Sequence, residues 1–450
     1  MSQFSQKRGD FFNPTNNDLY EVMMIANKNG EVVTTNNRFP VDAIIGGSSV
    51  YNETGNLSGS TDAFGRLRMS TPFTVFDNSF RTGDDTRVWD TDSAGIGGAS
   101  TTYLDNESTM AMDIGADSGD KCIRETTRTF QYQPGKSLLV MNTFVMDSAK
   151  TNLSQRVGYF EEDNGIFFEM ADSDLYIVKR TKISGTAQDI KIPQSQWNVD
   201  KLDGTGASGI TLDPSKAQIQ WMDLEWLGVG SVRVGFVING QFIIAHIFHH
   251  ANEIDSVYMT TASLPIRYEI ENTGPTSGAS RLKHICNSVI SEGGFTPVVE
   301  TRSAGTSLAG LILSQTVYRP LISIRLKSAA HFAIVVPSLL NLYGLQSNAY
   351  GFKIILNPTL TGGSWVSGGD ESTVEYNITA TALTGGKTLM QGLFMGGDKG
   401  SALQMDLESR NHSMQLKRGI DNTPYILTIA AIATNNNDYA IGSLTWSEFN

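Results

Sequence analysis

Residues 220–249, QWMDLEWLGVGSVRVGFVINGQFIIAHIFH, predict the fold class of the chain. Apolar residues alternate with polar or small ones in residues 232–236 and again in residues 242–248, which is the period of a half-buried strand. Asn239 and Gly240 lie between the two runs, and such a pair tolerates the positive φ angles of a type I′ hairpin turn. The stretch therefore predicts a β-meander in the middle of a sheet, and it carries no catalytic constellation.

The composition of the chain agrees with an all-β class. Its 450 residues include 44 glycines, and 40% of the residues are hydrophobic while 18% are charged. Glycine supplies the turn conformations that many short strands require. A chain of this length exceeds one typical hydrophobic core, so we expect more than one domain.

The charge and hydropathy of the chain argue against two classes of partner, nucleic acid and membrane. A net charge of −12 and a pI near 5.0 argue against nucleic acid, whose binding needs a basic surface. The first residues contain no apolar segment typical of a signal peptide. No apolar run reaches the length of about 18 residues that a transmembrane helix requires. We therefore expect no nucleic acid partner and no membrane insertion.

The chain has two cysteines, Cys122 and Cys286. Two are too few for a disulfide framework, so we expect buried thiols rather than a bridge. This usage is typical of a protein that folds in a reducing cytoplasm.

Changes in polarity along the chain predict four segments. Residues 1–60 are polar with scattered apolar side chains, which favours either a disordered terminus or an extended arm that orders on another subunit. We prefer the docking arm, whose apolar anchors would be Phe11, Phe12, Met23, Met24 and Phe39. Residues 61–295 predict a lectin-like or jelly-roll β-sandwich with strands at roughly 8–12-residue spacing. Residues 296–320 predict a connector, and residues 321–450 predict a second β-sandwich.

Two fragments resemble part of a phosphate-binding loop, at Gly135-Lys136-Ser137 and Gly386-Lys387-Thr388. The full motif needs a glycine five positions earlier, where this chain has Phe130 and Thr381, and a helix afterwards. Neither condition holds, so we expect no nucleotide cofactor.

Two further clusters suggest metals without meeting their requirements. His246, His249 and His250 could supply imidazole ligands, but on a strand His249 faces away from the other two, so a strand end with buried or interfacial histidines is preferred. The run from Asp90 to Thr101 resembles a calcium loop but lacks the acidic fifth and twelfth ligands. A looser calcium site remains an alternative in this acidic loop or around Asp113, Asp117 and Asp120. Solvated turn acids are preferred, and we predict no metal and no catalytic residue.

Acids and aromatic residues offer the remaining candidates. A glycosidase needs two carboxylates about 5–10 Å apart across a cleft, which sequence alone does not reveal. Carboxylates are plentiful, for example Glu161, Glu162, Asp163, Asp172 and Asp174. Solvent-facing positions are expected for Glu161, Glu162 and Asp163, which directly precede the predicted Asn164-Gly165 turn. Core positions are expected for Trp221, Trp226, Trp365 and Trp446. No serine or cysteine has a nucleophile-elbow pattern.

Several long strings of the chain resemble virion structural proteins of tailed bacteriophages, especially phages of aquatic bacteria. These strings are DAFGRLRMSTPFTVFD (62–77), RVGYFEEDNGIFFE (156–169), QWNVDKLDGTGASGITLD (196–213), WLGVGSVRVGFVINGQ (226–241), YMTTASLPIRYEI (258–270), ISEGG (290–294) and ILNPTLTGGSW (355–365). The resemblance covers most of the chain after residue 60 and supplies no catalytic residues.

The resemblance implies a non-enzymatic virion structural protein. We expect a repeated subunit, a homotrimer, attached to the head or tail as a decoration or fibre-like component, with the arm docked on other virion proteins. The main alternative is a lectin-like tail module that binds a glycan on the host surface, since the INGQ turn resembles concanavalin-like sandwiches. A glycan-degrading enzyme of the same sandwich class is the second alternative.

Overall fold

The computed structural model describes residues 71–294, 298–397, 402–407 and 414–449, together with the backbone of four short strands near the N-terminus. Contacts within the chain define two units, Met1–Ser60 and Thr61–Asn450. The first unit contains two antiparallel pairs, β1 (Gln6–Phe12) with β2 (Leu19–Ile25) and β3 (Ile44–Ile45) with β4 (Ser48–Ser49). The predicted docking arm and its apolar anchors lie outside the residues whose side chains are described.

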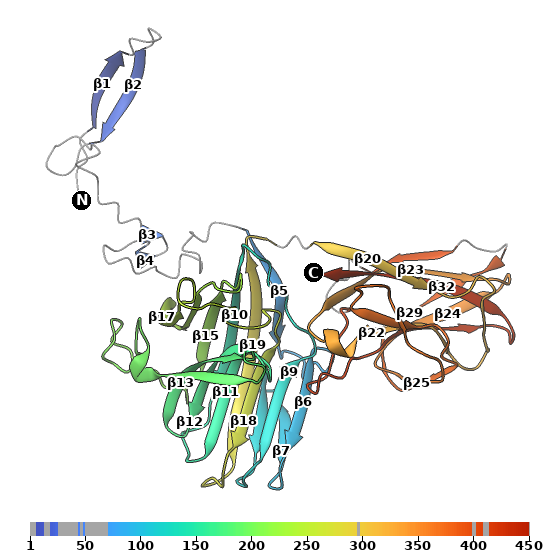
Figure 1. The fold of residues 1–450 in the computed structure, drawn as a ribbon, viewed down its shortest axis with the longest axis horizontal. Helices are drawn as coiled ribbons and strands as arrows, with labels where there is room; N and C mark the ends of the chain where they lie inside the picture. Colours follow the sequence, from blue (N-terminus) through green and yellow to red (C-terminus); the bar gives the residue numbers. More distant parts are fainter. Residues whose placement is uncertain are drawn as a thin grey trace. The chain divides into compact units, whose positions relative to one another are not determined.

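The second unit begins with a sandwich of two antiparallel sheets (Figure 1). One sheet has the order β17 (Gln241–Phe248), β16 (Val232–Ile238), β15 (Gln218–Leu224), β10 (Ser137–Val145), β19 (Ser280–Glu292), β8 (Thr109–Ile114) and β7 (Ala99–Leu104), with β5 (Pro72–Ser79) also paired to β19. The other has the order β14 (Gln188–Pro193), β13 (Asp174–Thr181), β12 (Gly165–Ala171), β11 (Leu153–Phe160), β18 (Ile266–Asn272), β9 (Lys121–Thr126) and β6 (Trp89–Ala94). We call the latter the seven-stranded sheet.

A second sandwich follows in the chain. One of its sheets has the order β20 (Val299–Gly305), β32 (Tyr439–Phe449), β23 (Ile334–Gly344) and β30 (Leu403–Asp406), with β21 (Leu311–Ile312) also paired to β32. The other has the order β26 (Val366–Ser367), β27 (Val374–Asn377), β22 (Arg319–Leu326), β31 (Leu427–Ala433), β24 (Ala349–Leu356) and β29 (Lys387–Met395). A small pair joins β25 (Thr359–Thr361) to β28 (Ala382–Thr384).

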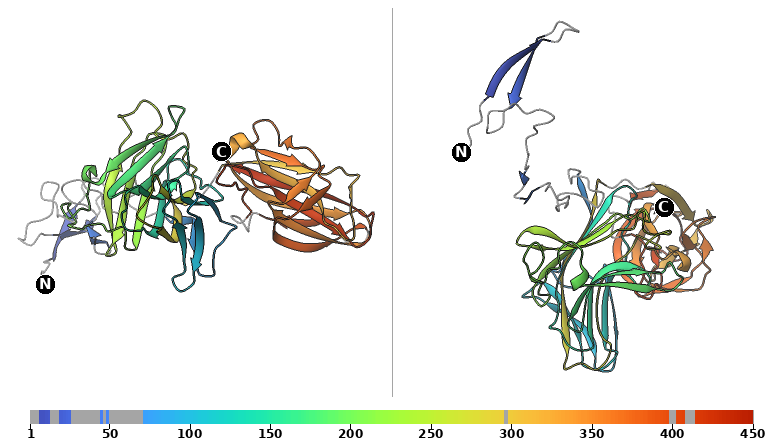
Figure 2. Two further views of the ribbon diagram at one scale, coloured as in Figure 1. Left: turned by 90° about the horizontal axis from the view of Figure 1, so that it is seen from below. Right: turned by 60° about the vertical axis from the view of Figure 1, so that its left-hand side comes forward.

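The prediction of an all-β protein with two sandwich domains is confirmed. Within the described part of the chain, helical structure is limited to two short 3-10 turns, η1 (Gln194–Gln196) and η2 (Ser328–Ala330). None of the helices there is long and apolar enough to cross a membrane. Figure 2 shows the strands of each sandwich from two further sides.

The segment 296–320 differs from the predicted connector. It supplies β20 and β21, and both pair with β32 of the second sandwich. Only Ala304 of β20 is buried, so this edge strand lacks the apolar alternation that identifies a strand in the sequence. The second sandwich therefore begins close to residue 299.

The stretch 220–249 forms the predicted meander, but at the edge of its sheet. The strands β15, β16 and β17 follow one another, and β17 has no partner on its outer side among the described strands. The φ angles of Asn239 and Gly240 are 54° and 75°, as a type I′ turn requires. A register shift opposite Val234 and Gly235 adds one residue to β17 and interrupts the predicted alternation there.

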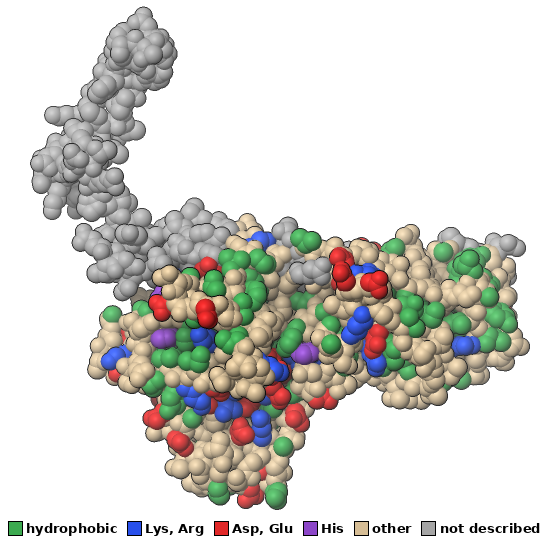
Figure 3. All heavy atoms as spheres, in the orientation of Figure 1, with side chains coloured by type: hydrophobic (Ala, Val, Ile, Leu, Met, Phe, Trp, Pro, Cys, Tyr) green, Lys and Arg blue, Asp and Glu red, His purple; other side chains and the backbone are tan. Residues whose placement is uncertain are grey.

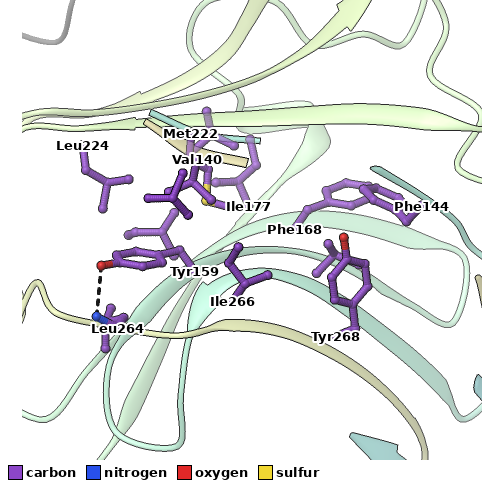
Figure 4. Close-up of a cluster of buried hydrophobic side chains, with 14 of the residues drawn as sticks. Val140, Phe144, Tyr159, Phe168, Ile177, Met222, Leu224, Leu264, Ile266 and Tyr268 are labelled. Carbon is purple, nitrogen blue, oxygen red and sulfur yellow. Dashed lines mark hydrogen bonds between the residues drawn. The ribbon is translucent and has the colours of Figure 1, made fainter. Parts of the chain in front are cut away.

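The core between the two sheets is aromatic and aliphatic, and one polar group within it is fully satisfied (Figure 4). The Tyr159 hydroxyl donates toward the carbonyl oxygens of Phe130 and Ala262, each 2.7 Å away, and accepts from the Leu264 N–H at 3.0 Å. Because Tyr159 is completely buried, these bonds replace the water that it loses on folding. They join three segments that are distant in the sequence.

Candidate functional site

The outer face of the seven-stranded sheet carries charged side chains at alternate strand positions. In β18, Ile266, Tyr268 and Ile270 pack into the core, so the intervening Arg267 and Glu269 project to the other side. The same alternation operates in the neighbouring strands. The sheet thereby presents a row of charges on one rigid surface.

The strand register places opposite charges directly across from one another. Arg156 on β11 is paired with Glu169 on β12 and with Glu269 on β18. Residues opposite each other on antiparallel strands are close enough for their side chains to interact. Arg156 Nε lies 2.8 Å from Glu169 Oε1, and its Nη1 also contacts Glu269. Arg156 Nη1 lies 3.1 Å from Glu271 Oε2 as well.

Arg267 lies on the neighbouring strand β18, two residues before Glu269. It is paired in register with Glu125 on β9, and Arg267 Nη1 lies 3.0 Å from Glu125 Oε2. Its Nη2 lies 2.7 Å from Glu269 Oε2. Arg156 and Arg267 therefore hold Glu269 from two sides.

These charges are buried, which makes their pairing essential. The side chains of Glu169 and Glu269 are 0% and 3% exposed. Burial opposes ionisation of Glu269, but Arg267, Arg156 and Lys121 outweigh it and hold the pKa of Glu269 well below its ordinary value. Burial is likewise outweighed at Glu169, whose pKa is lowered by Arg156 and Lys191. Both carboxylates are therefore ionised hydrogen-bond acceptors at neutral pH.

An open groove of about 490 Å³ lies over this network. Its lining consists of Lys121, Arg156, Glu162, Arg180, Ala187, Asp189, Arg267 and Glu269. Figure 3 shows positive and negative side chains gathered over β11, β13 and β18 on this face. We call this feature the charged groove.

The β13–β14 hairpin forms one side of the charged groove. Arg180 on β13 makes a two-point contact with Asp189 on β14, with distances of 2.7 and 3.0 Å. Tyr176 lies on the same face of β13, across from Glu169, and is partly exposed. The groove thus combines fixed donors and acceptors with an aromatic ring nearby.

The acidic residues around the Asn164-Gly165 hairpin differ in burial and in hydrogen-bond partners. Glu161 is buried, where a solvent-facing position was predicted, because its Oε1 accepts from the Asn164 N–H at 2.7 Å. Glu162 lines the charged groove. Asp163 pairs with Lys182 at 2.6 Å, and Asp172 accepts from the Asn152 N–H at 2.5 Å.

The four tryptophans that were predicted to lie in the core differ in their burial. Trp221 and Trp446 are completely buried, as predicted. Trp226 is partly buried against the first core, and its indole N–H donates to the Met259 carbonyl at 3.3 Å. Trp365 lies outside the core, where Arg325 stacks 4.1 Å from its ring centroid. The prediction of a core position is therefore wrong for Trp365, which is only partly buried and directly precedes the short edge strand β26.

The three histidines at the end of β17 differ in their burial. His246 and His250 are buried, and His249 is exposed. In the described part of the chain, no group of three or more His, Cys, Asp or Glu side chains is arranged to hold a metal ion. Cys122 and Cys286 are both free thiols, and Cys122 is buried.

The motif fragments lie on strands or in internally bonded turns. Ser137 begins β10 and Lys387 begins β29, so no helix follows either phosphate-loop fragment. Asp90 and Asp92 lie in β6 rather than in a calcium loop. Asp120 instead accepts backbone hydrogen bonds from Gly97 and Asp117.

Comparisons with known proteins show similarity to solved structures, but none to a protein family or to a curated protein. No family model matches the chain, and no curated protein matches it either. Solved structures that match include a family 16 glycosyl hydrolase from Mycobacterium smegmatis, with 10% identity, TM-score 0.34, and coverage of 48% of this chain and 100% of that one. A β-1,3-glucanase from Mycobacterium marinum matches with 12% identity, TM-score 0.32, and coverage of 48% and 98%. The carbohydrate recognition domain of Emp47p matches with 12% identity, TM-score 0.29, and coverage of 48% and 94%.

One prediction requires correction after these comparisons. The chain was predicted not to be an enzyme, and the matches to glycoside hydrolases contradict that prediction. A fold alone does not determine a function, which has to be argued from the residues of a site. The fold and the groove together define the class of the protein. It is an all-β protein of two sandwiches with a charged groove on one sheet.

Proposed function

We propose that the charged groove binds a glycan. The observation that carries this proposal is the preorganised set of donors and acceptors on the seven-stranded sheet, held by Arg156 and Arg267. Sugar hydroxyls donate and accept hydrogen bonds, and bonds to charged partners contribute about 1.5–3 kcal/mol each. Mutual neutralisation of the charges also leaves no large field that would restrict the groove to ionic ligands.

A glycan array followed by titration calorimetry tests this proposal. The test variant replaces two lining residues together, Lys121→Gln and Glu162→Gln. Its control replaces Lys283→Gln and Glu107→Gln, a pair 2.6 Å apart on the other sheet and its connecting loop. We expect the wild type and the control to bind the same glycans, and the test variant to bind at least about tenfold more weakly, a loss of about 1.4 kcal/mol. Binding that survives the test variant unchanged would contradict the proposal, as would an array with no bound glycan.

Hydrolysis of the bound glycan is the second candidate, and one observation favours it. Arg267 contacts two carboxylates, Glu125 and Glu269, whose pKa values are shifted in opposite directions. Burial raises the pKa of Glu125 to about 7, while that of Glu269 is lowered. Paired carboxylates with divergent pKa values are a feature of glycosidases, and Glu269 is the member of this pair that lines the groove.

The release of reducing ends from glycans that bind the protein distinguishes the two candidates. If the chain is a hydrolase, Glu269→Gln in a folded protein should abolish release, because Glu269 is the ionised carboxylate of this pair that lines the groove. Binding without release by the wild type would leave recognition as the function. The role in a phage particle stays a prediction from the sequence resemblance.

A further inference from the structure

A second cavity lies on the opposite side of the β13–β14 hairpin from the charged groove. It has a volume of about 680 Å³ and opens to solvent between this hairpin and the loop after β17. Its lining residues include Lys179, Thr181, Ile190, Asn252, Val257 and Tyr258. We call it the Lys179 pocket.

Lys179 is an unusual cation because its charge is buried without an anionic partner. The residue is 9% exposed, and within the described part of the chain no carboxylate lies within 4.0 Å of its ammonium group. Burial lowers the pKa of Lys179 from its ordinary value, and no neighbouring carboxylate opposes this shift. A buried charge without a counter-ion is costly to a fold.

The neighbours of Lys179 fix its ammonium group in place without neutralising it. His250 Nδ1 lies 2.6 Å from the Gly230 carbonyl oxygen, so Nδ1 carries the proton and Nε2 is left as an acceptor. Lys179 Nζ lies 2.9 Å from that Nε2. Its ammonium also lies 5.4 Å and 6.0 Å from the ring centroids of Phe248 and Tyr258. One N–H of Lys179 thus has a neutral acceptor, and the aromatic rings supply only a partial negative charge.

We propose that the Lys179 pocket binds a small ligand through a single oxyanion group, a carboxylate or phosphate, seated on Lys179 Nζ. An oxyanion there would supply the missing counter-charge and accept the remaining N–H bonds of the ammonium. The apolar side chains of Ile183, Ile190 and Val257 would contact the body of the ligand. This inference is independent of the glycan proposal, because it concerns the other side of the hairpin.

The acidic residues at the pocket define which anions fit. Glu253 and Asp255 line it and are exposed to solvent. Their charges repel a ligand that carries several negative groups, and they favour one whose remaining part is neutral or cationic. We therefore expect a monoanion to bind and a polyanion to be excluded.

Titration calorimetry with four probes tests the inference: galacturonate, galactose, inorganic phosphate and a heparin oligosaccharide. Galacturonate and galactose share a sugar ring and differ in the carboxylate, so their comparison isolates the anion. We expect galacturonate or phosphate to bind with a dissociation constant of about 1 mM or tighter at this site, and galactose and heparin not to bind here. Binding of galacturonate but not phosphate would identify a carboxylate ligand, and the converse would identify a phosphate ligand.

Variants locate the binding and separate it from the charged groove. Lys179→Met should abolish anion binding, and Lys179→Arg should retain it more weakly because the cation remains. Lys182→Met is the matched control, since Lys182 follows β13 directly but pairs with Asp163 at 2.6 Å. Lysine NMR supplies a second readout, because a bound anion must raise the pKa of Lys179.

Three results would overturn the inference. These are equal binding of galacturonate and galactose by the Lys121→Gln, Glu162→Gln protein, unchanged anion binding by a folded Lys179→Met protein, and no binding of either small anion tighter than about 1 mM. Loss of glycan binding in the charged groove would not affect the outcome, because the Lys121 and Glu162 variants leave the Lys179 pocket intact.

Discussion

Tyr159 shows how a single hydroxyl can hold distant segments of a β-sandwich together. Replacing it by phenylalanine keeps the ring in the core but removes the partner of the Leu264 N–H and two carbonyl oxygens. An unsatisfied buried polar group costs about 1–3 kcal/mol, so we expect Tyr159→Phe to lower the free energy of unfolding by that amount. Urea denaturation followed by tryptophan fluorescence measures the change.

Tyr176→Phe is the control for this prediction. Its hydroxyl lies 3.3 Å from Asp174 Oδ2 at the surface, so its removal should change the unfolding free energy by less than about 0.5 kcal/mol. Equal effects of the two substitutions would contradict the assignment of Tyr159.

Glu125 makes stability depend on pH in a direction opposite to that of most acids. Its ordinary pKa is 4.5, and burial raises it to about 7 in the folded protein. The folded state therefore binds more protons than the unfolded chain between these pH values. The stabilising contribution is present below pH 4.5 and is lost as the pH rises through about 7.

Replacing Glu125 by glutamine should remove this dependence. We expect the wild type to lose stability relative to Glu125→Gln by up to about 1.4 kcal/mol for each pH unit in the window. Urea denaturation across the window measures the difference, and the exposed Glu300→Gln substitution is the control. A constant difference between wild type and Glu125→Gln would show that the pKa of Glu125 is not raised.

At the scale of the elements, two glycines are required for different reasons. Gly235 of β16 allows a close approach to the neighbouring strand, and Gly240 of the turn allows a positive φ angle. A Cβ at Gly235 would lie 1.9 Å from the backbone oxygen of Ile243, which has no room to move. Gly240 has φ of 75° but no atom within 4 Å of an added Cβ. We expect Gly240→Ala to cost about 1–2 kcal/mol from the positive φ alone.

Gly235→Ala should cost more than about 4 kcal/mol or prevent folding, because two paired strands would have to separate. Thermal unfolding of the two variants beside the wild type measures the contrast. Similar melting temperatures for both would mean that β16 and β17 are not paired as described.

The sequence predicts the elements better than the site. Alternation and the Asn239-Gly240 pair were sufficient to predict the hairpin of β16 and β17. The charged groove was missed because Arg156, Glu169 and Glu269 lie on three strands, and each alone resembles a solvated residue of a half-exposed strand. Only the register brings them opposite one another. The pattern RYEIE of β18, with charges at every second position beside apolar residues, was the available signal.

At the scale of the whole molecule, a segment of the second sandwich completes the charge balance of the first. Arg418 Nη2 lies 3.1 Å from Glu125 Oε1, and both side chains are almost completely buried. The Arg418 N–H also donates to the Thr127 carbonyl at 2.9 Å. Removing Arg418 leaves Glu125 with Arg267 as its remaining partner, and the loss of a hydrogen bond to a charged group costs about 1.5–3 kcal/mol.

Arg418→Met should therefore lower the stability of the first sandwich although the substitution lies outside it. Calorimetry should show one unfolding transition in the wild type and two in the variant, because the sandwiches are then less coupled. Arg325→Met is the control, since Arg325 pairs with Glu375 at a more exposed position within the second sandwich. A single unshifted transition in Arg418→Met would contradict the coupling.

The predicted oligomer belongs to the same scale and rests on the sequence of residues 1–60. If this segment is an arm that orders on another subunit, its apolar residues contribute to stability only in the assembly. Light scattering should then give the mass of a trimer for the full chain and of a monomer for residues 61–450. Monomers in both cases would make the segment a tether to other proteins, and trimers in both would assign the subunit contacts to the sandwiches. Because Thr61–Asn450 is a separate unit by its internal contacts, the shorter protein should keep its fold, and circular dichroism can verify this before the masses are compared.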